Sequence, residues 1–206
     1  MNIATPEHCC SYVIDRRDRL VAVDDGWKEF ASDNHCADVF PERILRTCLW
    51  DYISGMANRL AYKKLLDCGR RTGEPIHLTM RCDSPSEERW LEVSLIPLED
   101  QCCVFETTVL QHQSRPPVNL LDPTAVRSSQ SVEVCSWCMN LNVSQLDWLP
   151  IRSALLALDL DPDGPQPHLV YTMCPDCSEG VGRILMEHDY AGLTSYRGRK
   201  KEVFPY

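Results

Sequence analysis

The stretch PIHLTMRCDSPSEERWLEVSLIPLEDQCCVFETTVL, residues 75–110, decides the fold class of the first half of the chain. In PIHLTMRCD, and again in RWLEVSLIPL, apolar side chains recur at every second position. A period of two puts successive side chains on opposite faces of a β-strand. The polar turn DSPSEE separates these two runs, and QCCVFETTVL follows as a third β-prone run. The stretch therefore predicts three consecutive strands joined by hairpins.

The residues before this stretch predict a hairpin followed by helices. Two short apolar runs, SYVID and LVAVDD, flank the polar turn RRDR within residues 11–25. Helical spacing of apolar residues then predicts helices over residues 26–34, 42–53 and 56–71. The predicted order is two strands, three helices and three strands. It indicates an antiparallel sheet with helices on one face, which is an α+β fold.

Residues 11–110 resemble a PAS domain. The resemblance rests on the tryptophan-bearing helix at 26–30, the segment LWDYISG at 49–55 and the GEP at 73–75 that leads into the third strand. PAS domains are sensory and protein-interaction modules, and some hold a cofactor between sheet and helices while many hold none. The resemblance implies a sensor or interaction domain whose ligand, if it has one, is unknown.

No known PAS cofactor signature is present. The flavin-reactive subfamily carries an asparagine-cysteine-arginine-phenylalanine core, whereas Cys36 stands in DNHCADVF without the Arg-Phe that would follow it. His35 or His77 could each bind a haem in a PAS cavity as a single histidine ligand. A single histidine is, however, more often an ordinary surface group. We therefore expect neither flavin nor haem.

The second half of the chain contains two C-x-x-C pairs, CSWC at 135–138 and CPDC at 174–177. The two-residue gap lets both sulfurs of a pair face one ion, and two pairs complete a tetrahedral shell of four sulfurs. Such a shell predicts one structural Zn²⁺ with no open position for a catalytic water. The predicted ligands are Cys135, Cys138, Cys174 and Cys177. An iron–sulfur cluster or a dithiol redox switch stays an alternative, because both use the same sulfurs.

The residues around the pairs predict a small treble-clef-like module. A β-prone run precedes each pair, at 132–134 and 169–172, and apolar spacing predicts a helix over 148–158. Pro175 is suited to the first turn of a helix, whose N-terminus would favour the thiolate of Cys177. The arrangement resembles a C-terminal extension found after PAS or receiver domains in bacterial signalling proteins, although Ser-His-Gly of that pattern is replaced by Val-Tyr-Thr at 170–172 and its basic residue by Met139.

Composition divides the chain into four parts. Residues 111–131 carry three prolines, four serines and no aromatic residue, which is typical of a linker. The PAS-like domain then covers 11–110, the four-cysteine module 132–190, and a basic C-terminal tail 191–206. The tail carries Arg197, Arg199, Lys200 and Lys201.

The overall composition excludes several classes of protein. Hydrophobic residues make up 44% and charged residues 25%, as in ordinary globular proteins. The net charge of −9 disfavours nucleic acid and anionic membranes as partners. No apolar run is long enough to span a bilayer and the first residues do not resemble a signal peptide, so we expect a cytoplasmic protein.

These observations indicate a bacterial regulatory protein and not an enzyme. No nucleophile elbow, P-loop or dinucleotide fingerprint occurs. The signal would leave through another signalling protein or a second copy of the chain, making a homodimer. Trp90 is the candidate contact residue, because it lies on the opposite strand face from Leu91 and Val93. The alternative function is a redox sensor that uses the C-x-x-C pairs.

Overall fold

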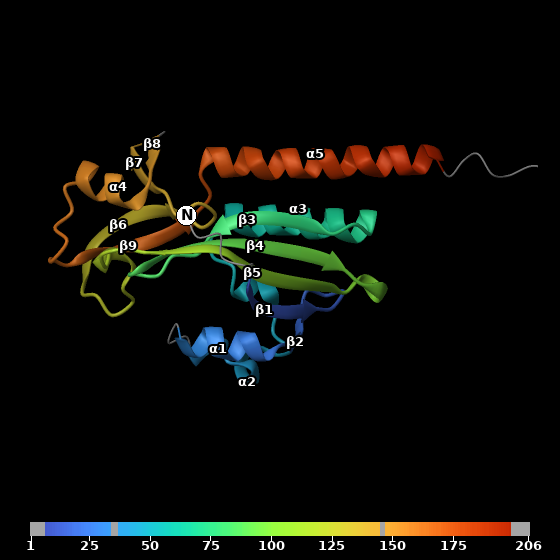
Figure 1. Cartoon of the computed structure of the whole chain (residues 1–206), viewed down its shortest axis with the longest axis horizontal. Coiled ribbons are helices and arrows are strands. Elements are labelled where there is room, and N and C mark those ends of the chain that lie inside the picture. Colours follow the sequence, from blue (N-terminus) through green and yellow to red (C-terminus); the bar gives the residue numbers. More distant parts are fainter. Residues whose placement is uncertain (1–6, 34–36, 145–146, 199–206) are drawn as a thin grey trace, which may run out of the picture.

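The computed structural model describes residues 7–33, 37–144 and 147–198. These residues form two β-sheets and a set of helices (Figure 1). The second sheet lies beyond one end of the first, and the long helix α5 (Pro175–Gly198) runs alongside α3 (Met56–Thr72). The mixture of sheets and helices confirms the predicted α+β class.

The first sheet contains the predicted hairpin and the three strands predicted within residues 75–110. Its strands are β1 (Glu7–Ile14), β2 (Leu20–Val23), β3 (Ile76–Arg81), β4 (Glu87–Pro97) and β5 (Cys103–Ser114). They lie in the order β2-β1-β5-β4-β3, and every neighbouring pair is antiparallel. The register sets Leu78 opposite Val93 and Leu95 opposite Phe105, so apolar side chains of β3, β4 and β5 share one face.

The helical segments lie between β2 and β3 in the sequence. They are α1 (Asp25–Asp33), a 3₁₀ turn at Ala37–Val39, α2 (Pro41–Ile44), a second 3₁₀ turn at Leu49–Asp51, and α3. α3 ends at Gly73, whose left-handed φ of 74° lets its N–H bond the carbonyl of Gly69. Side chains such as Leu65 of α3 and Ile44 of α2 are fully buried in one cluster with Leu95 and Phe105 of the sheet.

The prediction of one helix over residues 42–53 is wrong. The chain leaves helical geometry at Leu45, where ψ is 133°, and Arg46 has a left-handed φ of 71°. The N–H of Arg46 bonds the carbonyl of Leu20 (2.7 Å), and the N–H of Leu20 bonds the carbonyl of Thr47 (3.0 Å). Because this segment pairs with the start of β2, tertiary hydrogen bonds replace the helical ones that the apolar spacing suggested.

Residues 111–131, which their composition indicated to be a linker, are strand at both ends. β5 continues to Ser114, and β6 (Arg127–Cys135) begins before the segment ends. Between the two strands, Val118 and Leu120 are buried among apolar residues of the second sheet. The polar composition at 111–114 belongs to a strand end that is exposed to solvent.

The second sheet confirms both β-prone runs that precede the cysteine pairs. Its strands are β6, β7 (Leu141–Ser144), β8 (Asp147–Leu149) and β9 (Gln166–Thr172), in the order β8-β7-β6-β9. β6 and β9 are parallel, while the other pairs are antiparallel. Helix α4 (Ile151–Ala157) is shorter than predicted, because Trp148 pairs within the sheet and Pro150 caps the helix.

The two halves of the chain share a core. Trp137, Cys135, Cys174 and Val181 of the C-terminal half belong to the same buried cluster as Leu65 and Phe105 of the first. Helix α5 provides much of this contact, since it packs along α3 (Figure 1). Side chains of the four-cysteine region therefore pack directly against the core of the first sheet.

Helix α5 extends beyond residue 190, so the first part of the predicted basic tail is helical as far as Gly198. The remaining residues of that tail, 199–206, lie outside the described part of the chain, as do His35 and Cys36. None of the described helices is both long and apolar enough to cross a membrane.

Candidate metal centre

The two C-x-x-C pairs meet at one end of the parallel strands β6 and β9. The four Sγ atoms all lie within 4.8 Å of one another, and Cys138 Sγ is 3.7 Å from Cys174 Sγ. All four cysteines are free thiols, so no disulfide joins them. The structure thus brings together the residues that the spacing selected, namely Cys135, Cys138, Cys174 and Cys177.

The first pair lies in a tight turn after β6. The N–H of Met139 bonds the carbonyl of Cys135 (2.9 Å), and the N–H of Cys135 bonds the carbonyl of Asn140 (2.8 Å). Met139 has a left-handed φ of 62°, which costs a residue with a side chain about 1–2 kcal/mol. The Met139 side chain is buried among apolar residues of the second sheet, such as Val134 and Leu141, and this burial offsets the strain.

The second pair lies at the start of α5, as the proline predicted. Pro175 opens the helix, and Cys177 lies in its first turn. The N–H of Cys177 bonds Cys174 Sγ (3.4 Å), and the N–H of Cys174 bonds Cys135 Sγ (3.3 Å). Backbone donors and the positive end of the helix dipole both favour negative charge on these sulfurs.

The thiols share protons within the cluster. Hydrogen bonds donated first by Cys138 and then by Cys177 lower the pKa of Cys135 well below the ordinary thiol range, although burial opposes this shift. The pKa of Cys138 and the pKa of Cys177 are raised, chiefly because each donates its proton to Cys135. Cys135 is therefore the thiol of the cluster that loses its proton most readily, and the thiolate is the form of cysteine that binds metal.

The donor set fits one metal ion with four thiolate ligands. Zn–S bonds of about 2.3 Å in a tetrahedron place the sulfurs roughly 3.8 Å apart. The Cys138–Cys174 separation of 3.7 Å matches this spacing. Cys135 and Cys174 are buried while Cys138 and Cys177 are half-buried, so the cluster lies at the edge of the core. The four-cysteine group could thus hold one ion.

Residues of the first half support the CSWC turn from outside. The ring of Trp137, which is 5% exposed, packs on Tyr62 with 5.4 Å between ring centroids. The N–H of Arg81 bonds the carbonyl of Trp137 (2.8 Å), and Asn58 Nδ2 donates to Ser136 Oγ (2.8 Å). Sequence reasoning missed these contacts, although an apolar residue inside a C-x-x-C pair is itself a signal of packing.

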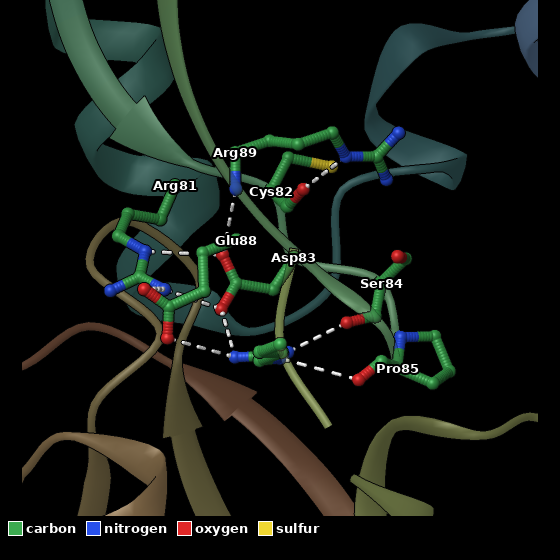
Figure 2. Close-up of polar contacts among 8 residues, drawn as sticks. Arg81, Cys82, Asp83, Ser84, Pro85, Glu88 and Arg89 are labelled. Carbon is green, nitrogen blue, oxygen red and sulfur yellow. Dashed lines mark hydrogen bonds and ion pairs between the residues drawn. The ribbon is translucent and has the colours of Figure 1, made fainter. Parts of the chain in front are cut away.

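A buried group of charged side chains, also missed by sequence reasoning, connects β3, β4 and the end of β5 (Figure 2). The Asp83 side chain is 0% exposed and that of Arg115 is 3% exposed. Arg115 pairs with Asp83 (2.9 Å) and with Glu88 (3.3 Å), while Arg81 pairs with Asp83 at 2.6 Å. The two arginines balance the two carboxylates.

Arg115 also binds the backbone of the β3–β4 turn. Its guanidinium donates to the carbonyl of Ser84 (2.6 Å) and to that of Pro85 (3.2 Å), and its own N–H bonds the carbonyl of Ser86 (2.8 Å). Because these charges are paired and hydrogen-bonded, the group has a structural role. These contacts hold Arg115, the residue directly after β5, against the β3–β4 turn at the point where the chain passes from the first sheet to the second.

The other candidate residues lie apart from the four cysteines. Trp90 is half-buried on β4, and the guanidinium of Arg81 covers its ring at 4.7 Å from the centroid. His77 is exposed and bonds Ser94 Oγ through Nδ1 (2.8 Å). A cavity of about 190 Å³ between the first sheet and its helices is lined mainly by apolar and aromatic side chains such as Trp27, and His77 is not among the residues that line it.

The chain matches no protein-family model, and a search of curated proteins found no match.

Proposed function

We propose that the chain is a regulatory protein in which a PAS-like region, residues 11–110, senses a signal or binds a partner and a treble-clef-like region holds one structural Zn²⁺. The observation that carries the metal assignment is the close group of four free thiols at the start of α5. A closed shell of four thiolates is typical of structural zinc and leaves no ligand position for catalysis. The proposed protein therefore acts without catalysis of its own.

The first sheet supports the PAS-like part of the proposal. It is antiparallel, and its helices are inserted between the second and third strands. Its small apolar cavity would suit an uncharged ligand, although such a domain can also act through protein contacts alone. We place the output on the outer sheet face around Trp90, with another signalling protein or a second copy of the chain as partner in the bacterial cytoplasm.

Metal content and the visible spectrum of the anaerobically purified chain test the metal assignment. We expect one zinc per chain and no visible absorption, and we expect Cys174→Ser to lose the zinc. Cys102→Ser is the matched control, because Cys102 is a free thiol outside the cluster. Iron with visible absorption, or full zinc content in Cys174→Ser, would overturn the assignment.

A redox switch is the second candidate, because Cys138 is half-buried and its sulfur lies 3.7 Å from that of Cys174. A peroxide would oxidise one thiol to a sulfenic acid and release water. The second thiol would then displace a second water to form the disulfide, so that two electrons pass from the sulfurs to the peroxide. Zinc release that coincides with a Cys138–Cys174 disulfide would support this function, and zinc retention under mild peroxide would refute it.

A further inference from the structure

Strand β6 directs its backbone groups alternately to its two neighbours. The N–H of Ser136, directly after the strand, bonds the carbonyl of Thr172 on β9 (2.9 Å), while the N–H of Cys135 bonds the carbonyl of Asn140 on the β7 side (2.8 Å). Residues two apart in a strand direct these groups to the same edge. Glu133 and Ser131 therefore direct theirs toward the β7 side, as Cys135 does.

Strand β7 leaves most of this edge uncovered. In the described chain, β7 pairs with β6 only where Leu141 lies opposite Val134. Asn142 and Ser144, which follow, pair with β8. No strand of the described chain therefore pairs with Ser131 on this edge. A strand edge without a partner is a place where another chain can add a strand.

An open groove of about 630 Å³ follows this edge. Residues 129–133 of β6 line it in unbroken succession. Because consecutive side chains of a strand point to opposite faces, such a lining follows the edge of the strand and not one face of the sheet. Five residues in a strand extend over about 16 Å, so the groove has the length of a short added strand.

The two sides of the groove differ in chemistry. The side of Val132 is apolar, because Val132 belongs to the same cluster of apolar residues as Leu158, and Leu160 also lines the groove. Ser131 and Glu133 point to the opposite face and are exposed. A strand added here would therefore have apolar side chains on one face and polar side chains on the other.

The charge of the groove is negative. Glu133 is the only charged residue among the described residues that line it. Its Oε2 accepts a hydrogen bond from Asn142 Nδ2 (2.7 Å), which holds the carboxylate at the groove without neutralising it. Exposed Asp159 stands between Leu158 and Leu160 in the sequence. A basic occupant complements these carboxylates, whereas the same edge of a second copy would bring another Glu133.

We propose that this groove binds an extended segment of a partner protein, which adds a strand to the open edge of β6 and alternates basic with apolar side chains. The added strand would bond the backbone of Ser131 and the N–H of Glu133. Its apolar side chains would lie beside Val132 and its basic ones beside Glu133. The site goes beyond the proposed function, since it uses neither the cavity of the first sheet nor the face around Trp90.

Titration of the full chain with the capped peptide Lys-Val-Lys-Val-Lys, followed by NMR, tests the proposal. We expect the amide signals of Ser131 and Glu133 to shift. The peptide Lys-Lys-Lys-Val-Val has the same charge without the alternation, and it should bind roughly fivefold more weakly. Equal binding of the two peptides, or no shifts at these residues, would overturn the proposal.

N-methylation of the peptide tests strand addition directly. A strand presents alternate N–H groups to its two edges, so methylation of the two valines and methylation of the last two lysines block opposite edges. We expect one of these peptides to bind at least about tenfold more weakly, through the loss of two hydrogen bonds, and the other to bind as before. Equal effects would contradict strand addition.

Two variants connect the binding to the edge of β6. Ser131→Pro removes an N–H from the open edge and leaves the bonds to β9, so it should weaken binding of the alternating peptide at least about tenfold. Glu133→Gln removes the charge of the groove and should weaken binding about threefold. Glu179→Gln is its matched control, because it removes the same charge from an exposed position on α5.

If Ser131→Pro does not fold, Glu133→Gln and the methylated peptides still test the site. Binding that Glu133→Gln and Glu179→Gln weaken equally would overturn the proposal. Light scattering of the chain without peptide examines the competing occupant. A dimer that Ser131→Pro dissociates would assign the edge to a second copy and would also overturn the proposal.

Discussion

The first sheet buries a continuous apolar layer against its helices, whereas the second sheet has a smaller core with the four-cysteine cluster at one end. The buried cluster of the first sheet includes Phe105 and a row of leucines and isoleucines. The separate cluster of the second sheet contains eight buried residues, none of them aromatic. Small cores supply little net stability. The comparison leads us to expect that the second sheet depends on the proposed cation and on its neighbour, while the first depends mainly on its own packing.

Removal of the cation should have the largest effect and should separate the two sheets. Structural zinc contributes an apparent binding free energy of about 10–16 kcal/mol in small zinc modules at neutral pH. After chelation under reducing conditions, we expect amide protection to fall in β6, β9 and the first turn of α5, and to persist in β3, β4 and β5. Hydrogen exchange followed by mass spectrometry measures both. Equal loss of protection in the two sheets would break the comparison.

Truncation of Trp137 should weaken both halves, because its ring lies in the core that they share. We expect Trp137→Ala to lower the free energy of unfolding by about 3–5 kcal/mol, as for other buried aromatic residues. Trp137→Phe should cost less, since Trp137 Nε1 has no hydrogen-bond partner to lose within the described chain. Urea unfolding followed by circular dichroism measures the change. A loss confined to the second sheet would show that the first gains nothing from this contact.

Replacement of Arg115 tests the connection between the sheets. Arg115→Met leaves Asp83 paired with Arg81 alone and frees the β3–β4 turn, so we expect a loss of about 3 kcal/mol. Arg183→Met is the control, because the Arg183–Glu179 pair is exposed and should contribute below about 0.5 kcal/mol. If the two variants were equally stable in urea, the buried group would not have the structural role assigned to it.

The smallest effect should come from Asp24, which is not part of the four-cysteine cluster, and it should appear only above acidic pH. Burial raises the pKa of Asp24, but hydrogen bonds from Ser11 Oγ (2.7 Å) and the N–H of Trp27 (2.9 Å) outweigh it and lower the pKa to about 2. Because the folded-state pKa is below the unfolded value, the carboxylate stabilises the fold above about pH 4 and loses this effect as the pH falls toward 2.

Asp24→Asn should therefore cost about 1–2 kcal/mol at pH 7, after allowance for partial exposure, and almost nothing at pH 2. The difference in unfolding free energy between the variant and the parent chain, measured from pH 2 to pH 7, checks this. Zinc content should not change. A pH-independent difference would mean that the charge of Asp24 has no role.

Local patterns predicted those parts of the fold that local interactions determine. The period of two in residues 75–110 gave three strands, and Pro175 gave the start of α5. The break at Arg46 was not predictable, because hydrogen bonds to Leu20 on β2 decide it. Residues 111–131 resemble a linker in composition, but both ends of this segment are strand. Composition alone does not distinguish an exposed, polar strand end from a linker.

In the candidate site, too, the residues that a local pattern marks were predicted, and the contacts between distant residues were not. The spacing of the cysteines is a local signal with a direct chemical reading, so the four residues were found. The Asn58–Ser136 and Arg115–Asp83 contacts join residues 78 and 32 positions apart, and neither residue pair belongs to a sequence motif. Such pairs depend on how the two halves pack, which a single sequence does not display.

The packing of α5 on α3 has a consequence for synthesis of the protein on the ribosome. Arg71 of α3 pairs with Asp189 of α5, and these residues are 118 positions apart. At about 5–20 residues per second, α3 emerges roughly 6–24 seconds before its partner. During that interval Ala61 and its apolar neighbours, which lie beside Val181 and Leu185 in the finished molecule, have no cover from α5. A nascent chain that stalls within the second sheet would therefore display an apolar strip for chaperones or for aggregation.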